Sequence, residues 1–210
     1  MNLLKLLAVS LIIFLFWGCA EKKPITVKEF YAENIADFIK KMQIYDSLEG
    51  VLNLQYETKN SVLNGDASLR ISKNELLLRV YYMGFPAGEI YEENGEVSSN
   101  LLIEKDRLKQ LAIGIRKGFI WWNGNFTVSE DSENFFLKDG ERIIILKKDG
   151  FMPLKQTLTV DNQTILIIYN EYKKIQTEDG TALNMPSSIS VYYKNRTLKI
   201  KIEKIKIKNA

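Results

Sequence analysis

Pairs of Asn or Asp followed by Gly recur along this chain, and they constrain its fold more than any other local feature. Six of the 12 glycines follow Asn or Asp, at Asn64, Asn94, Asn123, Asp139, Asp149 and Asp179. An Asx-Gly pair tolerates the positive φ angles of a tight hairpin turn. Half of the glycines therefore predict turns between consecutive antiparallel strands.

The segments between these pairs alternate apolar and polar residues with period two, as half-buried strands do. We expect about eleven strands, at residues 48–56, 67–71, 75–83, 90–91, 97–102, 134–138, 141–147, 154–160, 164–176, 187–194 and 197–208. In the last segment the apolar residues shift from even to odd positions at Glu203-Lys204, which predicts a β-bulge. Its lysines are interpreted as a solvated row that protects an edge strand, with contact to anionic lipid as the alternative.

Two segments show helical spacing instead. In the first, Thr26 and Glu29 form a capping box before apolar residues at 27, 31, 35, 38, 39 and 42. In the second, residues 101–117 carry Leu108, Leu111, Ala112 and Ile115 on one face, with Gly118 as the C-cap. We expect both helices to cover the sheet, and a membrane-surface position is the alternative for the first.

The composition excludes most catalytic and metal-binding chemistry. The 210 residues include no His and one Cys, so a Ser-His-Asp triad, a Cys-His pair, a His-ligated metal and an internal disulfide are all excluded. Carboxylates are scattered over turns and strand ends, without a spacing that suits acid–base catalysis. With 29 Lys+Arg against 26 Asp+Glu, the net charge of +3 does not indicate nucleic-acid binding. We expect a binding protein with no enzyme activity, cofactor or metal.

The single cysteine, Cys19, stands at the end of a segment with the layout of an export signal. Lys5 precedes an apolar run over residues 6–17, which is shorter than the roughly 20 residues of a membrane-spanning helix. The Gly18-Cys19 end resembles the lipobox of bacterial lipoproteins, in which the cysteine carries the acyl chains. An uncleaved N-terminal anchor is the alternative.

This interpretation divides the chain into three parts. Residues 1–18 are the expected lipoprotein signal peptide, residues 19–25 a lipidated tether, and residues 26–210 a single half-barrel domain. The two residues after the cysteine, Ala20 and Glu21, do not include the Asp of an inner-membrane retention signal, so we expect the outer membrane.

The order of several segments resembles the LolA/LolB family of lipoprotein-localisation proteins, and most of all its outer-membrane receptor branch, LolB. These segments are the Gly18-Cys19 end, residues 47–52, residues 76–88, and residues 184–186 before the last two strands. The resemblance implies an unclosed antiparallel β-barrel with a helical lid over an apolar cavity. It also implies a monomeric, lipid-anchored protein that binds the acyl chains of lipoproteins, accepts them from a periplasmic carrier, and inserts them into the outer membrane from its periplasmic side.

The resemblance further implies a membrane-insertion loop with an exposed apolar residue. The matching residues are Pro86-Ala87-Gly88, with Ala87 at the position of the family's leucine. Pro86 and Gly88 suit the second and fourth positions of a type I turn, which puts Phe85 at its start. Phe85 is then either exposed for insertion into lipid or folded back into the core.

For the wall of the cavity we expect ten apolar residues: Leu52, Leu54, Tyr56, Leu69, Leu78, Val80, Tyr82, Trp121, Trp122 and Ile144. A contact with the lid or the membrane is the alternative for the two tryptophans. Two other functions remain open at this stage, a tethered carrier or sensor of another hydrophobic ligand and a structural envelope lipoprotein. A hollow barrel favours lipoprotein insertion or the carrier or sensor function, and a filled barrel favours a structural lipoprotein.

Overall fold

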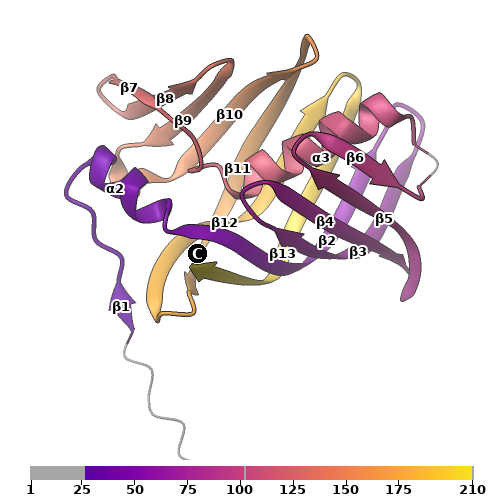
Figure 1. The fold of residues 1–210 in the computed structure, drawn as a ribbon, viewed down its shortest axis with the longest axis horizontal. Helices are drawn as coiled ribbons and strands as arrows, with labels where there is room; N and C mark the ends of the chain where they lie inside the picture. Colours follow the sequence, from indigo (N-terminus) through magenta and orange to yellow (C-terminus); the bar gives the residue numbers. More distant parts are fainter. Residues whose placement is uncertain (1–26, 102, 210) are drawn as a thin grey trace, which may run out of the picture.

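The computed structural model describes residues 27–101 and 103–209. The expected signal peptide, Cys19, the tether and Thr26 lie outside the described residues. One 13-stranded sheet dominates the described chain, and two α-helices pack on it (Figure 1). No helix among the described residues is long and apolar enough to span a membrane.

The sheet is antiparallel along its main path and does not close on itself. Its strands are β1 (Lys28–Glu29), β2 (Tyr45–Glu57), β3 (Val62–Ile71), β4 (Glu75–Tyr82), β5 (Phe85–Glu93), β6 (Glu96–Ser99), β7 (Thr127–Glu130), β8 (Asn134–Asp139), β9 (Arg142–Lys147), β10 (Pro153–Val160), β11 (Gln163–Gln176), β12 (Thr181–Tyr193) and β13 (Arg196–Asn209). The order is β6-β5-β4-β3-β2-β13-β12-β11-β10-β9-β8-β7, and β1 pairs in parallel with β12. The predicted unclosed antiparallel sheet is confirmed, and the two strands missed by the sequence pattern are the short β1 and β7.

Four of the six Asx-Gly pairs connect consecutive strands, as predicted. These are the pairs at 94–95, 139–140, 149–150 and 179–180. The prediction is wrong for the other two. Asn64-Gly65 lies inside β3, where a Cβ on Gly65 would come 2.7 Å from the carbonyl oxygen of Tyr81, and Asn123-Gly124 follows the second helix. The glycine in β3 therefore serves a close approach of two strands instead of a turn.

The bulge predicted at Glu203-Lys204 is confirmed, because the register of β13 on β2 shifts between Ile202 and Lys204. The prediction that this strand lies at the edge of the sheet is wrong. β13 lies between β2 and β12, in the middle of the sheet. Its lysines lie on the outer face of a central strand, where Lys199 pairs with Glu57 at 2.6 Å.

The first helix, α2 (Ile35–Met42), is shorter than predicted. Glu29 lies in β1, so the capping box does not form. The N-cap is Asn34, whose side chain accepts a hydrogen bond of 3.0 Å from the backbone N–H of Asp37. Three residues of α2, Phe38, Ile39 and Met42, are buried in the hydrophobic core, where the Phe38 ring stacks on Trp121 and lies 4.8 Å from the ring of Phe151.

The second helix, α3 (Lys105–Phe119), covers the concave face and contacts strands from both halves of the sheet (Figure 1). The predicted C-cap at Gly118 is wrong, because the helix continues through it to Phe119 and the C-cap is Ile120. A Cβ at Gly118 would lie 3.5 Å from the side chain of Ile167, which is an ordinary van der Waals contact.

Candidate functional site

An apolar cavity of about 470 Å³ opens between α3 and the first half of the sheet. No charged residue occurs in its described lining, which consists of Leu54, Tyr56, Leu63, Asn64, Gly65, Leu78, Val80, Tyr81, Tyr82, Ala87, Ile90, Leu101, Ile103, Leu111 and Leu198. The volume lies within the range of roughly 300–1,000 Å³ that is typical of ligand pockets.

The period-two pattern of the strands builds the floor of this cavity. Alternate residues of β2 and β4, among them Leu54 and Leu78, face the same side of the sheet and are buried. Leu111 of α3 and Leu101 before the helix form the roof. The side chain of Leu101 lies directly over Gly88, where any Cβ would clash with it. Gly88 therefore lets the roof approach the sheet.

Half of the predicted wall lines this cavity and half does not. Leu54, Tyr56, Leu78, Val80 and Tyr82 line it. Leu52, Leu69 and Ile144 are instead packed in the core, as are Trp121 and Trp122. Period-two spacing identifies the inward face of a strand, but it does not tell a packed position from a hollow one.

The two tryptophans lie near the C-terminal end of α3, away from the apolar cavity. The ring planes of Trp121 and Trp122 are nearly perpendicular, and the Trp122 indole N–H donates to the Tyr45 carbonyl oxygen at 2.8 Å. They join α2, α3 and β2 in one packed cluster.

Several residues that complete the cavity were not among the ten predicted for its wall. Leu101, Ile103 and Leu111 form the roof, and Leu63 and Leu198 extend the floor. The helical spacing marked Leu111 as an inward residue of α3, and the period-two pattern put Leu198 on the apolar face of the last strand. Which strands the helix covers is a matter of tertiary packing.

The predicted turn at Pro86–Gly88 is wrong, because these residues belong to β5. Pro86 pairs with Tyr81 across an irregular register, a position at which proline is tolerated in a sheet. The hairpin turn lies at Met83-Gly84, where both residues have positive φ angles (51° and 82°). Such angles are typical of a two-residue type I′ turn.

The residues around this turn form an exposed apolar tip, which we define as Tyr82, Met83 and Phe85. Met83 and Phe85 are 81% and 75% exposed, and Tyr82 is 59% exposed. Tyr82 also lines the apolar cavity, so the tip lies at its mouth. Of the two positions expected for Phe85, the structure has the exposed one.

A buried ion pair fastens α3 to the strands that carry the cavity. Arg116 Nε and Nη2 donate to the two carboxylate oxygens of Glu92 at 2.5 and 3.0 Å, and Nη1 donates to the Lys73 carbonyl oxygen at 2.7 Å. Glu92 has no exposed surface, and it also accepts from the Gly95 N–H at 2.8 Å. This contact joins residues 24 positions apart, and no sequence motif marks it.

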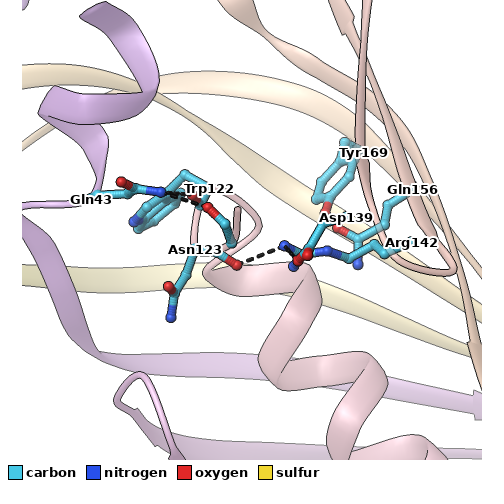
Figure 2. A network of polar contacts seen from close by, with 8 residues as sticks. Gln43, Trp122, Asn123, Asp139, Arg142, Gln156 and Tyr169 are labelled. Atoms are coloured by element: carbon cyan, nitrogen blue, oxygen red, sulfur yellow. Dashed lines mark hydrogen bonds and ion pairs between the residues drawn. The ribbon is translucent and has the colours of Figure 1, made fainter. Parts of the chain in front are cut away.

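A second polar network holds the loop after α3 (Figure 2). Arg142 Nη2 donates to the Asn123 carbonyl oxygen at 2.7 Å and to Asp139 Oδ2 at 3.0 Å. The Tyr169 hydroxyl donates to the Gly118 carbonyl oxygen at 3.1 Å. Burial lowers the pKa of Arg142 and raises the pKa of Tyr169, so the tyrosine is neutral at physiological pH.

Within the described residues, no group of three or more Cys, Asp or Glu side chains is placed to hold a metal ion. The site is thus an apolar cavity under α3, and polar contacts fix the C-terminal half of this helix to the sheet.

Comparison with known proteins supports the fold only. No family model matches this chain, and no curated protein matches it. A LolA superfamily protein from Nitrosomonas europaea superposes with a TM-score of 0.55 at 10% identity, over 85% of this chain and 96% of that chain.

Two further solved structures give lower TM-scores. An outer membrane lipoprotein-sorting protein domain from Vibrio parahaemolyticus gives 0.46 at 11% identity, and a DUF1329 family protein from Desulfovibrio piger gives 0.45 at 10% identity; each match covers 82% of this chain and 90% of the other. We base no argument on these two. The first match confirms the LolA-like fold that the sequence predicts.

Proposed function

We propose that this chain is a lipid-anchored, cofactor-free protein that binds the acyl chains of lipoproteins, accepts them from a periplasmic carrier and inserts them into the outer membrane. The observation that carries the proposal is the uncharged cavity with the apolar tip at its mouth. The LolA-like fold and the sequence resemblance to LolB support it.

The cavity volume suits about one acyl chain. A methylene group occupies about the volume of a water molecule, roughly 30 Å³, so a chain of about 16 carbons needs about 480 Å³. The cavity has about 470 Å³. Transfer of each methylene group from water into it contributes about 0.8 kcal/mol, which makes a long chain the favoured ligand.

The reaction needs no covalent chemistry, because a chain only moves between apolar environments. For net transfer, the cavity must bind the chain more tightly than the carrier does and more weakly than the bilayer does. The uncharged wall supplies the affinity, and α3 shields the chain from water.

The apolar tip supplies a transient contact with the bilayer. Insertion of an aromatic side chain such as Phe85 contributes about 1.5–3 kcal/mol. Three such residues give a weak and reversible contact, which suits a step that must be repeated. We assign permanent attachment to acyl chains on Cys19, with residues 1–18 as the signal peptide. We further propose that the protein is a monomer on the periplasmic side of the outer membrane.

A transfer assay tests the proposal. The chain, anchored in liposomes through Cys19, is mixed with a carrier–lipoprotein complex, and the lipoprotein that reaches the liposomes is measured. We expect transfer, and its absence refutes the insertion role. A fluorescent fatty acid that still binds would then favour a carrier or sensor of another lipid, and loss of that binding as well would favour a structural lipoprotein.

A further inference from the structure

A second cavity, with a polar lining, lies at the C-terminal end of α3. Its volume is about 700 Å³, and it is bounded by the end of α3, the loop 122–125, the start of β2 and the turn between β3 and β4. Asn74, Asn123 and Asn125 line it, and their side-chain amides make no hydrogen bond with another described residue. The polar cavity therefore offers donors that the fold itself does not use.

Cations outnumber carboxylates in this lining. Lys73, Arg116 and Lys117 stand against Asp46 and Asp139. Asp139 is already paired at 3.0 Å with the buried Arg142, and Arg116 is paired with the buried Glu92. Lys73 and Lys117 make no ion pair with a described residue. The unpaired charges of the lining are therefore these two lysines and Asp46.

Lys117 is the least compensated of these cations. It is half-buried in the last turn of α3, and burial together with the charges of Arg142 and Arg116 lowers its pKa to about 8. A lysine in a last turn often caps helix carbonyls, but the Lys117 side chain makes no hydrogen bond to a described residue. Its ammonium group is therefore available to a ligand in the polar cavity.

We propose that the polar cavity binds a phosphate-type oxyanion, held by the ammonium groups of Lys73 and Lys117 and by the side-chain amides of Asn123 and Asn125. Lysine binds phosphate as a point charge, and charge-assisted hydrogen bonds are roughly twice as strong as neutral ones. The volume is larger than a bare anion needs, so the oxyanion can carry a small attached group. This inference does not depend on the proposed function, because it concerns a different cavity.

Calorimetric titration of the purified full-length chain with inorganic phosphate, and separately with glycerol 3-phosphate, tests the site. We expect binding of at least one of the two in the millimolar range or below. Lys117→Met should weaken it about tenfold, as loss of one charge-assisted hydrogen bond does. Lys206→Met, at an exposed lysine of β13, is the matched control and should leave the affinity unchanged.

Lys117→Met should not disturb folding, because it removes a half-buried charge that makes no ion pair with a described residue. Tighter binding of glycerol 3-phosphate would indicate a lipid headgroup as the source of the oxyanion, and equal or tighter binding of phosphate would indicate the free anion. Absence of binding for both, or equal affinity in Lys117→Met and the wild type, overturns the site and leaves water as its occupant. Binding of a fluorescent fatty acid, measured in parallel, reports on the apolar cavity alone.

Discussion

Two neighbouring leucines of β4 offer a matched test of the apolar cavity. Leu76 and Leu78 have exposed fractions of 0% and 2%, but only Leu78 lines the cavity. Truncation of either to Ala should destabilise the fold by about 2–5 kcal/mol. Only Leu78→Ala should also enlarge the ligand site, by three carbon groups, or about 90 Å³ at roughly 30 Å³ each.

The enlarged site should prefer longer chains. Each methylene group that gains an apolar contact contributes about 0.8 kcal/mol, which is about fourfold in Kd. In the wild type this gain should end near 16 carbons, whereas in Leu78→Ala it should continue for about two or three more. Displacement of a fluorescent fatty acid by a series of 12 to 20 carbons, roughly the range that the cavity volume brackets, measures it. Leu76→Ala should keep the wild-type preference at a similar loss of stability; if both variants show one preference, the assignment of the cavity is refuted.

Three further predictions concern the tip, the ion pair and the free lysine. Phe85→Glu should stall transfer to liposomes while the unfolding free energy changes by less than about 0.5 kcal/mol. Tyr192→Glu, at a less exposed aromatic of β12, which β3, β2 and β13 separate from β4, should transfer normally. Unchanged transfer in Phe85→Glu would remove the tip from the mechanism. Arg116→Met leaves a buried carboxylate without its cation and should lower the unfolding free energy in urea by about 3–5 kcal/mol. Arg79→Met breaks an exposed ion pair and should cost much less; equal losses would contradict the role of burial. The pKa of Lys117, lowered by burial to about 8 from 10.5, means that the unfolded chain binds more protons between these values. The free energy of unfolding should therefore rise between about pH 8 and pH 10.5 by a larger amount in the wild type than in Lys117→Met. Parallel pH profiles of the two proteins would contradict the lowered pKa.

Local turn chemistry predicted most of the hairpins, but not where other residues replace glycine. The turn at Met83-Gly84 has a non-glycine residue at positive φ, while Gly65 and Gly88 lie inside strands for close packing. A glycine signals either a positive φ or the absence of a Cβ, and the sequence does not separate the two. This ambiguity moved the predicted tip from Met83 to the proline two residues after Gly84.

Residue pattern alone determined the sheet class, the strand count to within two and the bulge near Lys204, because these depend on neighbours in the chain. Tertiary structure decided which inward residues surround a void and which are packed, as the contrast between Leu78 and Leu76 shows. It also brought Arg116 to Glu92 and left Lys117 without an ion-pair partner among the described residues. Cavities, buried ion pairs and unpaired charges depend on the distance between segments far apart in the chain, and neither periodicity nor spacing encodes that distance.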